Sequence, residues 1–421
     1  MPAPHHRAPN LSLFLRLCTF GTLLAIAAPS SAEDWPNWRG PRGDGSSQDT
    51  GLPVEWNGAD QPAMNVAWKV PVPGKGHASP IVWKDRIFVV SALVDSEERV
   101  LLSFDRESGR QLWQKTVLKS PLEGKHELNS FASSTPATDG ELIYVAFLDR
   151  EEMFVAAYDF AGEQRWQARP GPFSSKHGFC SCPVLFENLV IINGDHDGDS
   201  FVAALDRATG KAVWKIAREN HTRSYVTPIV RELAGRTQLI MSGNKCVSSY
   251  DPRTGQPHWT IDGPTEQFVA SIVESDGLLF MTCGFPDHHM LAIRPDGQGN
   301  VTDTHIAWRE QKGASYVPSP IAVDGHFLVV SDNGILSCFE ATTGKRNWML
   351  RIGTKFSASP IAAAGLAYFT ADDGVTTVVR PGPEFTKVAE NQLGEHCYAS
   401  PAASQGKLYF RGEGHLAAIG K

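Results

Sequence analysis

An acidic run in the middle of the chain, Asp195-His196-Asp197-Gly198-Asp199, has the residue types that could bind a metal ion. Alternate carboxylates on a turn can offer their oxygens to Ca²⁺. The run lacks the downstream glutamate and the glycine position of an EF-hand loop, and it follows an apolar stretch where a polar hairpin turn is expected. We therefore expect no bound metal and interpret the run as a solvated turn. The candidate ligands, if a metal does bind, are Asp195, Asp197 and Asp199.

A second set of residues recurs at one place in a repeated phrase. Each member is an aromatic residue or a histidine shortly before a Ser-Pro, Thr-Pro or related pair: His77, Phe131, Phe179, Tyr225, Phe268, Tyr316, Phe356 and Tyr398. Basic residues stand in the connections around them: Lys75, Lys125, His126, Lys176, His177, His221, Arg223, Lys312, Lys355 and His396. If the repeats close into a ring, these residues would surround the mouth of its central channel. A basic, aromatic-lined mouth suits an anionic small ligand or an acidic, extended peptide, because the field and the stacking act together.

The same residues also have a purely structural interpretation. The aromatic rings could pack between neighbouring repeats, and the lysines could simply keep the loops soluble. Acidic residues in these connections are fewer, chiefly Glu127, Glu266 and Glu395. Both interpretations remain open at the level of the sequence.

The repeat that must position these residues is marked by tryptophan. Seven tryptophans follow one another at spacings of 40 to 53 residues: Trp68, Trp113, Trp166, Trp214, Trp259, Trp308 and Trp348. A period of this size indicates one supersecondary unit repeated, each copy too small to bury its own apolar face. Four short strands with turn signals between them, repeated eight times, predict an all-β, eight-bladed β-propeller of four-stranded antiparallel blades.

The two ends of the repeat region complement each other. The last unit stops at Leu416–Ile419 and has no tryptophan strand, whereas Asn65–Val70 is a tryptophan strand with no unit before it. We expect this N-terminal strand to complete the eighth blade and so close the ring without an open edge. Each tryptophan should then be buried against the neighbouring blade. The fifth unit departs from the pattern at Arg294–Gly297, which interrupts the phrase before Trp308.

The phrase Ala-x-Asp-x-x-Thr-Gly-x-x-x-Trp, clearest at Ala204–Trp214, resembles the tryptophan-docking motif of pyrroloquinoline-quinone (PQQ)-like propeller repeats. The resemblance covers about Asn65 to Lys421. The segment Asp34–Pro41 also resembles the opening of secreted bacterial PQQ-like repeat proteins. In repeat type and size the chain is similar to the propeller subunit of the outer-membrane β-barrel assembly machinery. The resemblance implies the fold, but fold alone does not carry a function.

Quinoprotein dehydrogenases with this repeat use PQQ, a Ca²⁺ held by carboxylate and amide oxygens, and a carboxylate base, and many carry an adjacent Cys-Cys pair. The nearest approach here is Cys180-Ser181-Cys182, whose two thiols would point to the same face of a strand. The chain has no Cys-x-x-Cys-His haem motif and no nucleophile motif. These departures from the family pattern favour a protein without a cofactor, and bound PQQ and Ca²⁺ are the alternative.

The first 32 residues have the pattern of a secretory signal, with basic Arg7 and Arg16, an apolar stretch at Leu17–Ala28 and a cleavage site after Ala32. No later stretch is long and apolar enough to be expected in a membrane. The expected organisation is a signal at 1–32, a Pro-, Gly- and Trp-rich strap at 33–64 and the propeller at 65–421. We expect a monomer in the periplasm or outside the cell. Its six remaining cysteines are interpreted as small buried hydrophobes rather than disulfide partners.

The formal net charge is −7, or −9 without the two arginines of the signal, and no basic run occurs. Nucleic acid is therefore not an expected partner. The preferred function is a non-enzymatic, extracytoplasmic scaffold that presents its loops to a protein partner. One alternative is a PQQ- and Ca²⁺-dependent oxidoreductase of the alcohol or aldose dehydrogenase type. The second is a carbohydrate- or polyanion-binding module, whose association would be strongly salt-sensitive.

Overall fold

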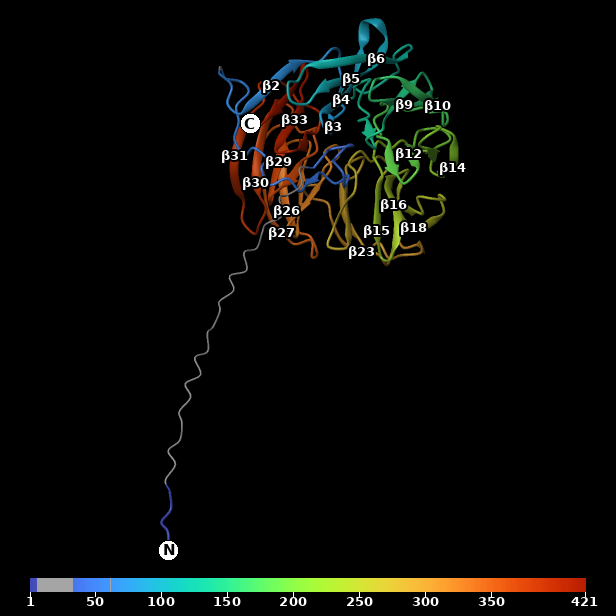
Figure 1. Ribbon diagram of the computed structural model, residues 1–421. Helices are drawn as coiled ribbons and strands as arrows, with labels where there is room; N and C mark the ends of the chain where they lie inside the picture. Colours follow the sequence, from blue (N-terminus) through green and yellow to red (C-terminus); the bar gives the residue numbers. More distant parts are fainter. Residues whose placement is uncertain (6–32, 61) are drawn as a thin grey trace. The chain divides into compact units, whose positions relative to one another are not determined.

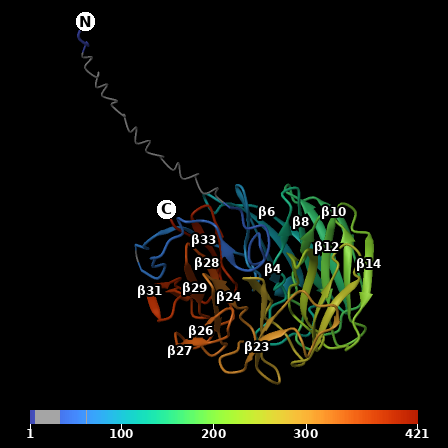
Figure 2. The same ribbon diagram turned by 90° about the horizontal axis from the view of Figure 1, so that it is seen from below.

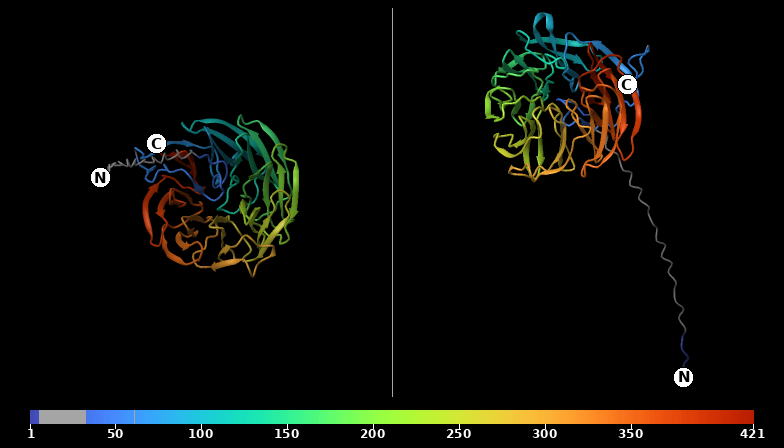
Figure 3. Two further views of the ribbon diagram at one scale, coloured as in Figure 1. Left: turned by 60° about the horizontal axis from the view of Figure 1, so that its bottom comes forward. Right: turned by 180° about the vertical axis from the view of Figure 1, so that it is seen from behind.

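Eight separate β-sheets form the repeat region, as the tryptophan period predicts. The computed structural model describes residues 1–5, 33–60 and 62–421. Within the unit Ala32–Lys421 the sheets are the blades of an eight-bladed propeller, arranged in a ring (Figure 3). Most of the predicted secretory signal lies outside the described residues. None of the helices in the described part of the chain has the length and apolarity to cross a bilayer.

Each blade has four antiparallel strands, and in blades 1 to 7 these run outward from the channel in chain order. Blades 1 to 3 are β3 (Ile81–Trp83), β4 (Arg86–Leu93), β5 (Glu98–Asp105) and β6 (Gln111–Lys119); β7 (Ala137–Thr138), β8 (Leu142–Asp149), β9 (Glu152–Asp159) and β10 (Gln164–Ala168); and β11 (Val184–Phe186), β12 (Leu189–Gly194), β13 (Phe201–Asp206) and β14 (Ala212–Ala217). A 3₁₀ turn, η1 (Val94–Ser96), joins β4 to β5.

The same order continues around the ring (Figure 2). Blades 4 and 5 are β15 (Ile229–Leu233), β16 (Arg236–Gly243), β17 (Cys246–Tyr250) and β18 (Pro257–Asp262); and β19 (Val273–Ser275), β20 (Leu278–Cys283), β21 (His289–Ile293) and β23 (Ile306–Glu310). Blades 6 and 7 are β24 (Ile321–Val323), β25 (His326–Val330), β26 (Ile335–Glu340) and β27 (Arg346–Arg351); and β28 (Ile361–Ala363), β29 (Leu366–Thr370), β30 (Val375–Arg380) and β31 (Thr386–Gln392).

Blade 8 joins the two ends of the repeat region. Its three inner strands are β32 (Ala402–Ser404), β33 (Lys407–Arg411) and β34 (His415–Ile419), and its outer strand is β2 (Val66–Pro71). The pairing is antiparallel, with Trp68 opposite Ala418 and Pro71 opposite His415. In Figure 1 the blue β2 accordingly runs beside the red strands of this blade. The predicted closure by the N-terminal strand is confirmed.

Most of the repeat tryptophans connect their blade to the next one, and β31 of blade 7 contains none. In six of the seven, the indole Nε1 donates to a backbone carbonyl of the following blade, as Trp113 does to Phe160 at 3.0 Å and Trp348 to Gly382 at 3.0 Å. Trp259 is the exception, because its Nε1 donates to Gln238 of its own blade at 2.8 Å. The irregular segment before Trp308 explains this difference. It forms β22 (Gly299–Asn300), which pairs with β18 as a fifth strand and covers the outer edge of blade 4.

The Ser/Thr-Pro positions link the innermost strands around the channel. At these positions, a backbone N–H donates to the side chain of the corresponding residue in the next blade. The seven links run Ser79 to Thr135, Thr135 to Cys182, Cys182 to Thr227, Thr227 to Ser271, Ser271 to Ser319, Ser319 to Ser359 and Ser359 to Ser400, at 2.9 to 3.3 Å. In this part of the chain the hydroxyl of Ser79 has no hydrogen-bond partner, so the described links leave the seam between blades 8 and 1 unbridged.

Residues 33–60 lie against the propeller. Residues 33–47 lie at the channel end where the innermost strands finish, whereas the part around Trp56 runs along β31, the outer strand of blade 7. Trp35 forms a β-bridge with Val82, and β1 (Ser46–Ser47) pairs with β28 of blade 7. The buried guanidinium of Arg39 donates to the carbonyl of Pro320 at 2.7 Å. Trp56 is 2% exposed. The segment thus contacts several blades at once, and its first part, which contains Trp35 and Arg39, covers the channel end.

Candidate functional site

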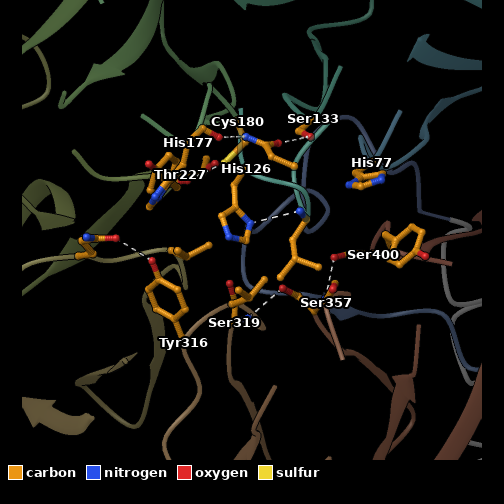
Figure 4. A pocket seen from close by; sticks show the side chains of 18 of the residues that line it. His77, His126, Ser133, His177, Cys180, Thr227, Tyr316, Ser319, Ser357 and Ser400 are labelled. Atoms are coloured by element: carbon orange, nitrogen blue, oxygen red, sulfur yellow. Dashed lines mark hydrogen bonds between the residues drawn. The ribbon is translucent and has the colours of Figure 1, made fainter. Parts of the chain in front are cut away.

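The channel opens on the face where the innermost strands begin. Because neighbouring strands are antiparallel, the connection between blades and the turn between the second and third strands meet at this face. A cavity of about 530 Å³ occupies the channel mouth (Figure 4). Eight of the residues that the sequence suggested line it: His77, His126, Lys176, His177, Arg223, Tyr225, Tyr316 and Tyr398.

The aromatic position of the repeat divides into two groups. His77 and the three tyrosines line the cavity, whereas Phe179, Phe268 and Phe356 are buried in the packing of the blades. Phe131 is half-buried, with the ammonium of Lys125 5.2 Å from its ring centroid. A tyrosine hydroxyl needs a polar partner, and a phenylalanine does not. This position of the repeat therefore lines the channel mouth in some blades and packs between strands in others.

Two of the three tyrosine hydroxyls at the mouth have such partners. The hydroxyl of Tyr225 lies 3.0 Å from Oγ of Ser175, and that of Tyr316 donates to Oε1 of Gln267 at 2.9 Å. Tyr398 stacks on His396, with the ring centroids 6.3 Å apart. These contacts fix the orientation of the rings around the mouth.

The basic residues also divide. His126, Lys176, His177 and Arg223 line the cavity from three successive connections between blades 1 and 4. Six others lie outside it: Lys75, Lys125, His221, Lys312, Lys355 and His396. Acidic residues on the neighbouring turns are more numerous than the sequence suggested, because Glu413 pairs with Lys75 at 2.6 Å and Asp197 pairs with Arg223 at 2.6 Å. The basic character is therefore confined to one arc of the mouth.

Two histidines of this arc are in contact. The rings of His126 and His177 lie 5.3 Å apart, and His177 stacks on Tyr225 at 6.1 Å. Burial lowers the pKa of His177, and the charges of Arg223 and Lys176 lower this pKa further. Burial also lowers the pKa of His77, to about 4. His77 and His177 therefore contribute little positive charge at neutral pH, and Lys176 and Arg223 are the lysine and arginine that line the cavity.

The lining residues that were not among the sequence candidates include Trp38, Leu128, Phe285 and Asp332. Trp38 belongs to the segment that covers the opposite channel end. Leu128 and Phe285 are 53% and 49% exposed, which is unusual for side chains of this size. Phe285 and Asp332 lie on turns between second and third strands, which the repeated phrase does not place at the mouth. The signal in the sequence that could have pointed to this site is the presence of large apolar residues, Leu128 and Phe285, in loops.

The acidic run 195–199 is a turn, but the expectation that it is solvated is wrong for Asp195. This side chain is fully buried, and its two oxygens accept from Nε and Nη2 of Arg218 at 3.0 and 3.2 Å. Although burial disfavours the charge of Arg218, the facing carboxylate raises the pKa of this guanidinium. Asp197 pairs with Arg223 instead, and Asp199 is exposed. The three carboxylates do not converge, and no group of three metal-ligating side chains is found among the described residues.

The two cavity cysteines have structural contacts. Sγ of Cys182 accepts the N–H of Thr135 at 3.3 Å and so takes the place of a hydroxyl in the ring of links. Cys180 Sγ lies 3.6 Å from the carbonyl of Tyr225. Burial raises the pKa of both thiols, which disfavours the reactive thiolate. Both belong to the six cysteines that are free in the described residues.

The polar atoms of the cavity do not fit a Ca²⁺-bound quinone. Ca²⁺ takes six to eight oxygen ligands, usually with several carboxylates. Asp332 is the single carboxylate among the described lining residues, and its oxygens accept the N–H groups of Tyr316 and Val317 at 2.8 and 3.0 Å. In the described chain no hydrogen bond joins a cavity hydroxyl or thiol to a histidine ring, so a nucleophile with its base is not assembled there.

The fold and its docking tryptophans define a propeller of PQQ-like repeats. The family model described as outer membrane protein assembly factor BamB matches residues 58–147, 96–282 and 297–381, which together cover more than half of the chain. The chain belongs to this family. No curated protein sequence matches it significantly.

Solved structures share the fold at low sequence identity. BamB from Moraxella catarrhalis is 13% identical, with a TM-score of 0.59, and the match covers 85% of this chain and 99% of that one. Quinohemoprotein alcohol dehydrogenase from Comamonas testosteroni is also 13% identical, with a TM-score of 0.67 and coverage of 92% and 81%. A europium-containing methanol dehydrogenase is 13% identical, with a TM-score of 0.63 and coverage of 91% and 90%. At such identities the likeness concerns the fold alone.

Proposed function

We propose that this protein is a non-enzymatic scaffold outside the cytoplasm that binds another protein with the face around the channel mouth. The observation that carries the proposal is the cavity at this mouth, whose rim exposes Leu128 and Phe285 beside a basic arc. Exposed apolar side chains rimmed by polar groups are typical of protein-binding surfaces. The secretory pattern of residues 1–32 and the assembly factor named by the family support the same proposal.

The oxidoreductase alternative is supported by the fold of the two dehydrogenases and opposed by the cavity itself. Asp332 already uses both oxygens on backbone N–H groups, which leaves too few ligands for Ca²⁺. A calorimetric titration with PQQ and Ca²⁺ tests this alternative directly. Saturable binding of one equivalent of PQQ, together with oxidation of alcohols or aldose sugars by an artificial acceptor, would replace the scaffold by an oxidoreductase.

The scaffold proposal is tested by cross-linking in the producing cell with two matched double variants. Leu128→Ser with Phe285→Ser removes apolar area at the mouth. Val213→Ser with Val388→Ser removes exposed apolar area from the outer strands β14 and β31, where these valines are 50% and 36% exposed. We expect the rim variant to lose the cross-linked partner and the outer-strand variant to keep it. The reverse pattern would place the partner on the outer strands and overturn the proposal.

A further inference from the structure

The channel mouth has two unlike walls. One wall is the arc from blades 1 to 4, where Lys176, His177 and Arg223 line the cavity. The other wall belongs to blades 5 and 6, where Phe285 and Tyr316 lie 6.5 Å apart, ring centre to ring centre. The labelled histidines and Tyr316 in Figure 4 come from these different connections and surround the same pocket. The first wall also carries Tyr225 and the exposed Leu128, so the two walls differ chiefly in charge, and a ligand that uses the whole mouth places its anionic group at the first wall.

The charges on the first wall are available to a ligand. Lys176 is exposed and forms no ion pair or hydrogen bond with the described residues. Asp197 occupies one nitrogen of the Arg223 guanidinium, which has five N–H donors in all. On the second wall, the Asp332 carboxylate is bound to two backbone N–H groups, which offset its charge. An acidic group is therefore attracted to the first wall more strongly than it is repelled by the second.

The mouth continues outward along one direction. A second hollow, lined by His288, Lys312 and Met349, lies at the boundary of blades 5 and 6, and Asp332 lines both hollows. The two hollows therefore adjoin at Asp332. An elongated ligand fits two adjoining hollows better than a compact one, and an extended peptide spans about 3.3 Å per residue.

Resting on the proposed function, we infer that the partner inserts an extended segment into this mouth, with an acidic side chain at Lys176 and Arg223 and an apolar side chain against Phe285 and Tyr316. Main-chain groups of the segment lie over the second hollow. The cavity of about 530 Å³ has room for the side chains of such a segment. The charge of the first wall selects the segment. The apolar wall of Phe285 and Tyr316 is already formed in the free protein and buries apolar area of the segment on binding.

Fluorescence anisotropy with two pools of labelled hexapeptides tests the inference. Every peptide of the first pool contains two glutamates and one phenylalanine or leucine in varied order, and the second pool has glutamine in place of glutamate. We expect the acidic pool to bind about tenfold more tightly to the full-length protein, since opposite charges at close range favour association. Lys176→Gln should weaken the acidic pool about fivefold, as expected for a charge at the edge of an interface. The control Lys211→Gln, on a turn of the opposite face, should leave binding unchanged.

The outcomes separate this inference from the scaffold proposal. Equal binding of the two pools, or an unchanged affinity in Lys176→Gln, overturns the acidic segment while the cross-linking result still decides the scaffold. Free glutarate or inorganic phosphate that displaces the acidic pool at the affinity of the peptides themselves identifies a small anion site and also overturns the inference. Displacement of the cross-linked partner by the acidic pool alone supports both.

Discussion

Gly210 lies directly against the indole of Trp166, which belongs to the preceding blade. A Cβ added at Gly210 would stand 2.5 Å from Cε3 of Trp166, and Gly210 has a φ of +71°. The indole Nε1 of Trp166 donates to the carbonyl of Arg207 in the same turn at 2.9 Å. The glycine of the repeated phrase therefore has two tasks, since it makes the turn and leaves room for the tryptophan of the previous blade. The repeat phrase encodes the contact between blades as well as the hairpin.

Gly210→Ala should destabilise the protein by about 3 kcal/mol, the sum of left-handed strain and a steric clash with Trp166. Gly277→Ala is the matched control. Gly277 has a φ of +75° but nothing within 4 Å of an added Cβ, so it should lose only about 1 kcal/mol. Urea unfolding followed by tryptophan fluorescence measures both. If the two variants lose the same stability, the close approach to Trp166 has no energetic role.

The ring of links at the Ser/Thr-Pro positions gives a second pair of matched variants. Ser359→Ala removes the acceptor of the Ser319 N–H, and a buried N–H without a partner costs about 1–3 kcal/mol. Ser79→Ala removes a hydroxyl that has no partner in the described structure, so its effect should stay within about 0.5 kcal/mol. Thermal unfolding compares them. A larger loss in Ser79→Ala would show that its hydroxyl closes the ring in solution.

The closing strand β2 supplies the tryptophan of blade 8. Trp68 donates to the carbonyl of Arg106 in blade 1 at 3.1 Å and packs on Gly109 of the same turn. We expect Trp68→Ala to cost about 3 kcal/mol, because a large aromatic contact between first and last blades is lost. Val213→Ala on β14, which is half-exposed, should change stability by less than about 0.5 kcal/mol. An unchanged melting temperature in Trp68→Ala would contradict closure through this strand.

The propeller could be predicted from the sequence because its signals are local and repeated. Trp68, Trp113 and their counterparts mark the outer strand of seven of the eight blades, and every copy reinforces the same period. Closure by β2 followed from counting strands at the two ends. The edge strand β22 could not be predicted, because it pairs with a different blade from the one that contains it, and such a pairing leaves no local pattern.

The site was less predictable because it depends on where loops from different blades meet. The repeat position placed Tyr225 and Tyr316 at the mouth, and it equally suggested Phe268, which packing buries. Asp195 looked like a solvated acid until its partner Arg218, 23 residues away, was visible. The charge of the mouth was hard to predict for the same reason, since Glu413 and Lys75 are far apart in the chain and adjacent in space. Side-chain partners across blades are set by the closed ring, and no single repeat contains that information.

Affinity for the acidic pool should depend on pH through His177. Burial, together with Arg223, His126 and Lys176, holds the pKa of His177 below its usual value, whereas Asp197 acts in the opposite direction, so the ring is mostly neutral at pH 7. A carboxylate bound nearby favours the charged imidazole and raises this pKa, so the complex binds more protons than the free protein. Affinity must then rise as the pH falls, and glutamate stays ionised above about pH 5. We expect binding to tighten about threefold to tenfold between pH 7.5 and pH 5.5.

His177→Gln should flatten this pH profile and leave affinity at pH 7.5 nearly unchanged, because the neutral ring contributes little charge there. His326→Gln is the control, since His326 begins β25 at the other end of the blade, away from the mouth. Its pH profile should follow that of the unaltered protein. A profile that remains steep in His177→Gln would assign the proton uptake to another group and remove His177 from the anionic wall. Loss of affinity at both pH values would mean that the ring acts through its stacking on Tyr225 rather than through its charge.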